Sequence, residues 1–468
     1  MIVPRPRLLF WFAVVVLPFA TLGGVYPPAL PVALLFIVGL ALVVAFDAAT
    51  GANCLDRISL QLPPVLRCSK DRAAALEVQL HNENPKVRRL RLGLVLPPQI
   101  QPAAEDLEVV LPADTAQSRV AFDCTPRQRG RFPLRQACLE TASPLGFWAV
   151  RARLPLNSEV RVYPNLFRER RNLAGLFLHR GAFGVHAQRQ VGKGRDFEKL
   201  RDYIPGDSFD EIHWKATAKR GRPVTKVFQI ERTQEIYVIV DASRLSARPS
   251  VPGSAFRVPR SRAEPSGLGE RNPEPGTRNS EPCLERFITS ALILGLVAEQ
   301  QGDLFGLLTF SDKVETFLRA RNGQAHYDAC RDALYTLEPR LVSPDFEEVA
   351  TFIRLRLRRR ALLVFLTALD DPLLAESFVR SMELVCRQHL ILVNLLPPAG
   401  VRPLFSNAAV ASVDELYREL GGHLRWQKLC ALQKVLQRRG VRLSLLEDAT
   451  MSAQLVSQYV GVKRRQVL

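Results

Sequence analysis

Two long apolar segments open the chain, and shorter patterned segments follow them. The apolar segments run from Leu8 to Tyr26 and from Pro28 to Phe46. Each is close to the roughly 20 residues that a helix needs to cross a bilayer. The link between them carries no charge. Residues 1–50 are therefore predicted to form a transmembrane helical hairpin, with spans at about 8–26 and 28–46.

A secretory signal peptide is the alternative for the first segment, because Arg5 and Arg7 precede it. The second apolar segment directly behind it, and the lack of a clear small-residue cleavage site, favour the hairpin. Basic residues also follow the hairpin, at Arg57, Arg67 and Lys70 among others. The positive-inside rule then predicts that both ends of the hairpin, and the soluble part, lie in the cytoplasm.

Short segments of alternating polarity occupy residues 56–164. Leu76–Leu80, Leu107–Leu111 and Arg119–Phe122 alternate or nearly so, and proline, asparagine and glycine punctuate them. Several short strands at a spacing of about ten residues are typical of a β-sandwich. We expect a β-sandwich domain here, without catalytic chemistry.

From residue 233 onward, continuous apolar runs alternate with helical periodicity. The runs are Glu235–Val240, Leu304–Phe310, Ala361–Thr367, His389–Leu396 and Val441–Leu445. Helices are expected at Leu284–Gln301, Phe346–Arg358, Leu373–Arg387, Ser412–Arg438 and Ala449–Tyr459. Ser343 is the expected cap of the second helix. Buried parallel strands have this apolar pattern, so residues 233–468 are predicted to form a Rossmann-like α/β domain with helices on both faces of the sheet.

Residues 247–281 interrupt this order. They contain six prolines and many serine, glycine and arginine residues, without periodicity. Such a segment can neither bury apolar surface nor sustain a strand ladder, so a disordered surface insertion is predicted.

The net charge and the cysteine content indicate the environment in which the protein works. The formal net charge is +18, for which an anionic membrane face, nucleic acid or an arginine-rich genome are the alternative explanations. The eight cysteines form no C-x-x-C pair and have no histidine at ligand spacing, so free thiols in a reducing compartment are predicted. Cys124 and Cys138 are the pair that a β-hairpin would bring together.

Residues 165–232 link the two domains, and their central part mixes both signs of charge with large apolar side chains. Tyr203–Asp207 has the composition of a tight turn, and the charged residues around it are close enough to form ion pairs around Trp214. Either an ordered linker that holds two domains together or a docking surface for a protein explains this composition. The suspected partner-binding residues are Arg201, Asp202, Tyr203, Gly206, Asp207, Trp214, Lys215 and Lys219.

This part of the chain closely resembles the centre of the bacterial DUF58 family, a domain of unknown function. The resemblance rests on Leu200–Asp207 (LRDYIPGD), Ile212–Ala216 (IHWKA) and Ala218–Gly221 (AKRG). It implies a von Willebrand factor A-like C-terminal domain. It also implies a partnership with a MoxR-type AAA+ ATPase in the assembly or maturation of another complex.

Von Willebrand A domains often hold a divalent cation at the edge of the sheet through an Asp-x-Ser-x-Ser motif. This chain has Asp241 and Ser243, but Leu245 replaces the second serine. Ala368 stands where a later aspartate is expected, with Asp370 two residues further on. A degenerate site without a cofactor is favoured over a Mg²⁺ site formed by Asp241, Ser243 and Asp370.

The sequence contains no P-loop, G-x-S-x-G or H-E-x-x-H motif, so no enzymatic activity is expected. It predicts a scaffold or adaptor anchored in the bacterial inner membrane. The MoxR-type ATPase would contact the central stretch and the edge near Asp241 and Ser243. The alternatives are a metal-dependent von Willebrand A module that binds a ligand, and a basic membrane protein that associates with nucleic acid.

Overall fold

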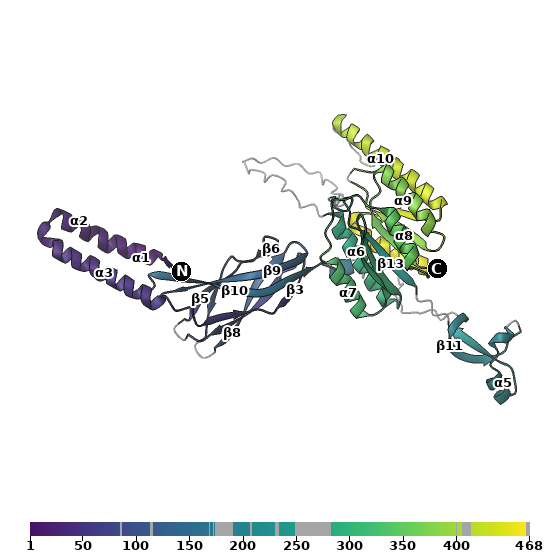
Figure 1. The fold of residues 1–468 in the computed structure, drawn as a ribbon, viewed down its shortest axis with the longest axis horizontal. Helices are drawn as coiled ribbons and strands as arrows, with labels where there is room; N and C mark the ends of the chain where they lie inside the picture. Colours follow the sequence, from purple (N-terminus) through teal and green to yellow (C-terminus); the bar gives the residue numbers. More distant parts are fainter. Residues whose placement is uncertain are drawn as a thin grey trace, which may run out of the picture. The chain divides into compact units, whose positions relative to one another are not determined.

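A computed structural model describes residues 1–84, 87–112, 116–167, 169–171, 173, 191–205, 208–229, 234–248, 282–398, 400–404 and 413–464. The chain divides into two compact units, Met1–Asn165 and Leu166–Leu468 (Figure 1). The predicted disordered insertion at 247–281 lies outside the described residues from position 249 onward.

A helical hairpin begins the first unit, behind the short strand β1 (Ile2–Pro4). Its arms consist of α1 (Pro6–Trp11), η1 (Phe12–Val16) and α2 (Leu17–Val25), then η2 (Pro27–Ala29) and α3 (Leu30–Gly51). Both arms are long and apolar enough to cross a membrane, which confirms the predicted pair of apolar helices. The rings of Phe19 and Phe36 stack with their centroids 4.6 Å apart, so the two arms pack against each other.

Two β-sheets form the rest of the first unit. One has the order β1-β10-β9-β5-β7, with β3 also paired to β10, and the other has the order β2-β4-β8-β6. The strands are β2 (Ile58–Gln61), β3 (Val65–Ser69), β4 (Ala74–Asn82), β5 (Arg89–Leu94), β6 (Ile100–Pro102), β7 (Leu107–Val110), β8 (Gln117–Pro126), β9 (Gly130–Ala142) and β10 (Trp148–Tyr163). Their inward residues, among them Leu76, Leu92 and Leu134, share one apolar core. The alternating pattern thus marks the buried face of each strand.

Cys124 and Cys138 do not meet across a hairpin, which corrects that expectation. Cys124 pairs with Ala74 in one sheet, while Cys138 pairs with Gly93 and Arg153 in the other. The chain changes sheets between β8 and β9, so the two cysteines do not face each other as partners in one ladder. Both thiols are free.

Both ends of the helical hairpin attach to the pair of sheets in this unit. Strand β1, ahead of the first helix, pairs with β10 so that Ile2 lies opposite Val150 and Pro4 opposite Trp148. The residues behind the second helix continue into the same pair of sheets. The sequence could not predict this pairing, because a strand of three residues has no periodicity to detect.

A buried carboxylate fastens the end of α3 to the turn between β9 and β10. Asp47 accepts hydrogen bonds from the Ser143 hydroxyl at 2.6 Å, the Leu145 N–H at 2.8 Å and the Phe147 N–H at 3.2 Å. The Trp148 indole N–H donates to the Val44 carbonyl at 3.0 Å. Since Asp47 is fully buried, these bonds satisfy a polar group that water does not reach.

A six-stranded sheet forms the centre of the second unit, in the order β15-β14-β13-β16-β17-β18. The strands are β13 (Glu235–Asp241), β14 (Leu304–Phe310), β15 (Val314–Arg321), β16 (Leu362–Thr367), β17 (Leu390–Leu395) and β18 (Arg442–Leu445). All neighbours are parallel except β14 and β15. The five predicted apolar runs correspond to the five parallel strands, as expected for strands that are buried on both faces.

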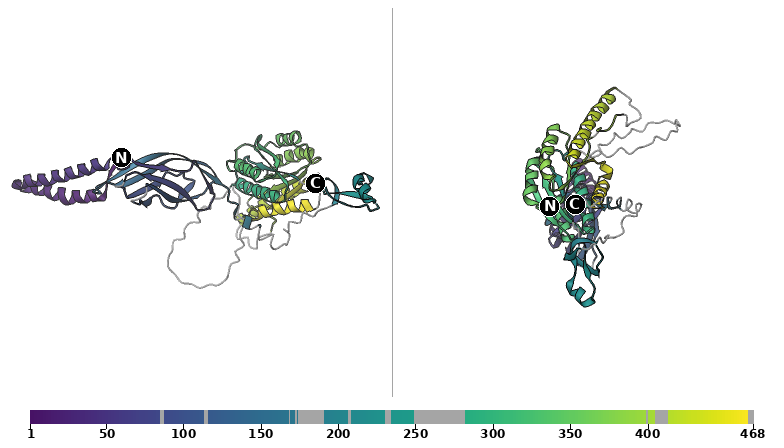
Figure 2. Two further views of the ribbon diagram at one scale, coloured as in Figure 1. Left: turned by 90° about the horizontal axis from the view of Figure 1, so that it is seen from below. Right: turned by 90° about the vertical axis from the view of Figure 1, so that its right-hand side faces the viewer.

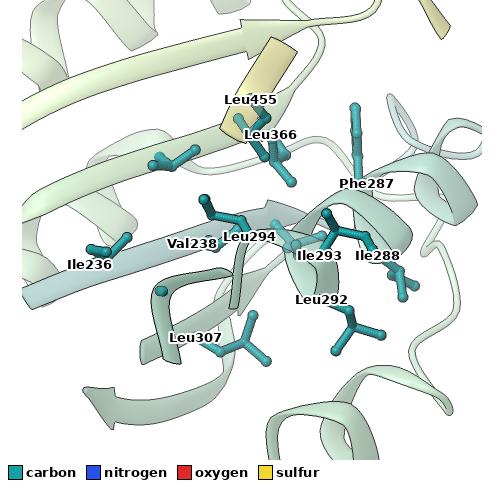
Figure 3. Close-up of a cluster of buried hydrophobic side chains, with 14 of the residues drawn as sticks. Ile236, Val238, Phe287, Ile288, Leu292, Ile293, Leu294, Leu307, Leu366 and Leu455 are labelled. Carbon is teal, nitrogen blue, oxygen red and sulfur yellow. The ribbon is translucent and has the colours of Figure 1, made fainter. Parts of the chain in front are cut away.

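Helices cover both faces of this sheet (Figures 1 and 2). One core contains residues of α6 (Cys283–Gln300), α7 (Gln324–Leu334) and α11 (Met451–Arg464), and the other contains residues of α8 (Phe346–Arg356), α9 (Pro372–Val385) and α10 (Val413–Arg438). Figure 3 shows the first core, where Phe287 of α6 and Leu455 of α11 lie near strand residues such as Val238. The predicted parallel sheet with two covered faces is confirmed.

Three local features differ from the prediction. The edge strand β15 and the helix α7 were not expected, because β15 is only half buried and α7 buries few apolar residues, Tyr327, Cys330 and Leu334. Asp345, rather than Ser343, caps α8 by accepting from the N–H groups of Glu347 and Glu348, both at 3.0 Å. A carboxylate also interacts favourably with the positive end of the helix dipole.

Candidate functional site

Asp241 lies at the carboxyl end of β13, in the middle of the parallel sheet. From β13 the chain moves to β14 on one side, and it later returns to β16 on the other side. The crevice outside β13 and β16 is therefore a topological switch point, where open α/β sheets bind their ligands. This is the first candidate site.

Hydrogen bonds hold both carboxylate oxygens of Asp241. Oδ1 accepts from the Ser243 N–H at 2.8 Å, and Oδ2 accepts from the Thr367 hydroxyl at 2.5 Å. The Ser243 hydroxyl in turn accepts from the Leu245 N–H at 3.3 Å. All four residues are buried. Burial raises the pKa of Asp241 above its ordinary value, and the hydrogen bonds from Ser243 and Thr367 oppose this shift.

Asp370 and Asp371 interact with arginines instead of joining Asp241 in a ligand set. The carboxylate of Asp370 forms an ion pair with Arg248. Asp371 caps α9 by accepting from the Leu373 N–H at 3.0 Å, and its other oxygen lies 3.7 Å from Arg244. The positive charges beside Asp370 and Asp371 are therefore the guanidinium groups of Arg248 and Arg244.

The described residues of this edge do not fit a divalent cation. Mg²⁺ prefers an octahedral set of oxygen ligands, whereas Asp241 is fully engaged and Asp370 is paired with Arg248. The buried Leu245 occupies the position of the second serine. No group of three or more His, Cys, Asp or Glu side chains suited to a metal ion occurs in the part of the chain that the structure describes.

A cleft of about 470 Å³ opens at the same edge of the sheet. It is lined by Arg248, Asp370, Asp371, Pro398 and Arg425. Pro398 follows β17 and Arg425 lies on α10, so four separate parts of the chain contribute to the cleft. Its charged side chains are two arginines and two aspartates, so both signs of charge meet there.

The buried carboxylate of Asp241 predicts a pH dependence of stability. Its folded pKa is raised, so its stabilising contribution is fully present below the unfolded pKa of about 4 and is lost as the pH rises through the folded pKa. The difference in free energy of unfolding between the native protein and Asp241→Asn should therefore shift against the native protein as the pH rises from about 4. Urea unfolding of the full chain in detergent, read by pulse proteolysis, measures this difference. If the free energy of unfolding of the native protein, relative to that of Asp241→Asn, stays constant or rises with pH, the pKa of Asp241 is not raised.

The second candidate site is the segment around Trp214, which has a fold of its own. Strands β11 (Val191–Asp202) and β12 (Val224–Gln229) pair antiparallel and enclose η3 (Phe209–Glu211) and α5 (Trp214–Arg220). His213 caps α5 by accepting from the Ala216 N–H at 3.0 Å, and Gly221 ends it with a positive φ of 65°. Ile212 and Val224 are buried beneath these elements.

Large apolar side chains on this segment face solvent. Trp214 is 68% exposed and Phe209 is 74% exposed, and Ile204 is also exposed. The rings of Tyr203 and Phe209 stack at 6.3 Å. Lys215 and Lys219 on α5 are exposed beside them. Exposed aromatic side chains on one small segment are typical of a surface that binds a protein.

The ion pairs expected around Trp214 include Asp207, which lies outside the described residues, so they stay a prediction. Asp202 pairs with Arg222 at 3.2 Å, and Arg222 was not among the predicted residues. Trp214 begins α5, and its side chain faces solvent. Arg201 and Asp202 lie at the end of β11, whereas Gly206 and Asp207 lie outside the described residues.

Sequence reasoning missed Thr367, Arg248 and Asp47. Thr367 had a detectable signal, because a polar residue ends an otherwise apolar strand beside Asp241. Arg248 borders the insertion, where no pattern exists to place it. The role of Asp47 could not be predicted from nearby sequence, because its hydrogen-bond partners lie about a hundred residues away, at positions 143–147.

Comparisons with known structures find distant likenesses. Proximal thread matrix protein 1 from the mussel byssus is 10% identical with a TM-score of 0.26, over 48% of this chain and 45% of that one, less than half its length. An aerotolerance-related membrane protein from Bacteroides fragilis is 13% identical with a TM-score of 0.27, over 49% of this chain and 98% of that one. An uncharacterized membrane-spanning protein from Vibrio fischeri is 14% identical with a TM-score of 0.16, over 49% and 98%.

No curated protein matches the sequence. A family model does match it, over residues 199–252 and 276–402, which include the segment around Trp214 and the sheet strands from β13 to β17. The predicted resemblance is confirmed by this match. The matched model is that of the family described as protein of unknown function DUF58.

Proposed function

We propose that this protein is a membrane-anchored scaffold or adaptor that docks a partner protein on the surface formed by Ile204, Phe209, Trp214, Lys215 and Lys219, here called the Trp214 surface. The observation that carries the proposal is the exposure of Trp214 and Phe209. Aromatic side chains that face water are unfavourable in a free monomer, but they supply much of the binding energy when a partner covers them. The lysines beside them favour a partner surface with carboxylates around an apolar pocket.

The proposed setting is the bacterial inner membrane, with the hairpin as anchor and with the two β-sheets of the first unit and the whole second unit in the cytoplasm. The pairing of β1 with β10 supports a hairpin whose two ends lie on one side of the bilayer. Basic residues next to both ends support the cytoplasmic side. Labelling intact cells with a membrane-impermeant maleimide tests this orientation. Tyr26→Cys, at the exposed hairpin turn, should react, and Leu355→Cys should react only after permeabilisation. The reverse pattern would place both units outside.

The resemblance of the segment 200–221 supplies the partner class, a MoxR-type AAA+ ATPase, and the role, assembly or maturation of another complex. We infer that the second unit is a von Willebrand factor A-like domain that contributes a contact surface and no catalysis. Its edge around Asp241 supports this inference, because buried hydrogen bonds and ion pairs hold the residues that would otherwise be free to react.

Binding of a purified MoxR-type ATPase to the full chain in nanodiscs tests the proposal directly. Trp214→Ala should weaken binding by about 30-fold or more, the effect of losing an interface residue worth about 2 kcal/mol. Leu355→Ala is the matched control, since Leu355 on α8 is similarly exposed, at 73%, but lies outside the proposed surface. Its affinity should not change.

Two outcomes would contradict this assignment. If the ATPase does not bind the full chain, the partner class is wrong. If it binds Trp214→Ala and the native protein equally well, the partner uses another surface. Circular dichroism of the variant should match that of the native protein, because Trp214 contributes little to any core.

A further inference from the structure

Helix α10 carries two apolar faces, of which its own unit buries one. Leu429 and Leu436 are buried in the core beneath the helix, and Trp426 and Leu432 pack against that core. These residues belong to its C-terminal half. The N-terminal half extends beyond the neighbouring helices of the layer (Figures 1 and 2).

The second face is an exposed stripe. Val413, Tyr417, Leu420 and Leu424 follow one another at intervals of four, three and four residues, and they are between 42% and 68% exposed. Gln427 and Ala431 continue the same intervals. Leu420 and Leu429 are nine residues apart, which is about two and a half turns of helix, so the stripe lies opposite the buried face. Alternating intervals of three and four residues between apolar positions are typical of a helix that packs along another helix.

We propose that this stripe packs against the same stripe of a second copy of the chain, with the two α10 helices antiparallel. Charge selects this partner and this direction. Asp414 lies beside the N-terminal end of the stripe and Lys428 beside its C-terminal end, on the same flank, because 14 residues are two heptads. Both are exposed. Antiparallel pairing places Asp414 of each copy next to Lys428 of the other, whereas parallel pairing would place like charges together.

This charge pairing fixes the register. With Asp414 opposite Lys428, the twofold axis passes near Gly422. Leu420 then packs on Leu424 of the other copy, and Val413 packs on Ala431. A twofold contact of this kind uses the same surface on both chains and closes after two copies. The seam from 413 to 431 is about 27 Å long, and a short seam of this size suits copies that a common membrane already holds close together.

Photocross-linking of the full chain in liposomes tests this pairing. With p-benzoylphenylalanine at position 417, irradiation should give a species of twice the chain mass, and mass spectrometry should place the cross-link within α10 of the second copy. The same probe at position 355, on α8, is the matched control and should give no such species. Leu420→Glu should reduce the yield by about tenfold or more, the effect of a loss of about 1.4 kcal/mol.

Charge exchange provides the decisive variants. Asp414→Lys should weaken the cross-link, and combining it with Lys428→Asp should restore it, a recovery that a general loss of folding would not give. Two outcomes would overturn the proposal: subunit counting by photobleaching that finds single copies at every protein density in the liposome, or cross-links at position 417 that reach only lipid. An undiminished dimer in Leu420→Glu would equally exclude this helix as the contact.

Discussion

Replacing Asp303 with alanine is expected to release the C-terminal helix α11 from the second unit. Asp303 is buried and precedes β14. It accepts hydrogen bonds from the Gln234 N–H at 3.1 Å, from Lys463 Nζ at 2.8 Å and from the Tyr459 hydroxyl. Burial and the neighbouring Asp303 carboxylate raise the pKa of Tyr459, so its hydroxyl remains a donor. Asp303 therefore joins the start of two central strands to the last helix.

Asp303→Ala should lower the free energy of unfolding. Breaking a buried ion pair costs roughly 3–5 kcal/mol, and we expect a value near the lower end because Lys463 is partly exposed and can turn to water. Hydrogen exchange of the α11 amides in the full chain measures the release. Glu376→Ala is the matched control, since its ion pair with Arg380 is exposed and is worth about 1 kcal/mol or less. Unchanged protection of α11 in Asp303→Ala would show that apolar packing alone holds the helix.

Replacing Asp47 with alanine is expected to detach the turn at residues 143–148 from the end of α3. The change leaves the Leu145 and Phe147 N–H groups and the Ser143 hydroxyl without their acceptor. Each buried donor left unpaired costs roughly 1–3 kcal/mol. Faster hydrogen exchange at Leu145 and Phe147, measured on the full chain in nanodiscs, is the expected result.

Asp47→Asn should give an intermediate effect, because the amide keeps one acceptor oxygen and replaces the other with a donor. Thr50→Ala is the matched control: Thr50 is one turn further along α3 and bonds the Phe46 carbonyl of its own helix. It should leave both amides protected. If Asp47→Ala also leaves them protected, the turn is held by Trp148 and its bond to Val44 alone.

The sequence predicted the elements that are buried on both faces far better than those that are half exposed. The runs that became β13, β14, β16 and β17 are short and mostly apolar, which is typical of strands that are buried on both faces. Strand β15 is intermediate in exposure along most of its length, and helix α7 buries only Tyr327, Cys330 and Leu334, so neither has a continuous apolar run. Strand β1 depends on a partner that lies almost 150 residues away, and local periodicity carries no information about it.

Candidate sites were harder to predict, because their residues derive their roles from partners distant in sequence. Asp241 was identified from its place at the end of a buried strand, but its acceptance of a hydrogen bond from Thr367 depends on which strand lies next to it. The pairing of Asp370 with Arg248 spans 122 residues and the insertion. The charges near Trp214 predicted a ring that is surrounded by ion pairs, whereas the ring is 68% exposed.

The junction at Asp47 has a mechanical consequence. Strand β1 holds the start of the hairpin, and the turn at residues 143–148 holds its end through Asp47. No free hinge therefore separates the hairpin from the first sheet. A hydrophobic helix that is too long for its bilayer tilts, and α3, with 22 residues, is about 33 Å long. In a thinner membrane the sheet should therefore lean together with the helices, which makes lipid thickness a control on the direction in which the first unit points.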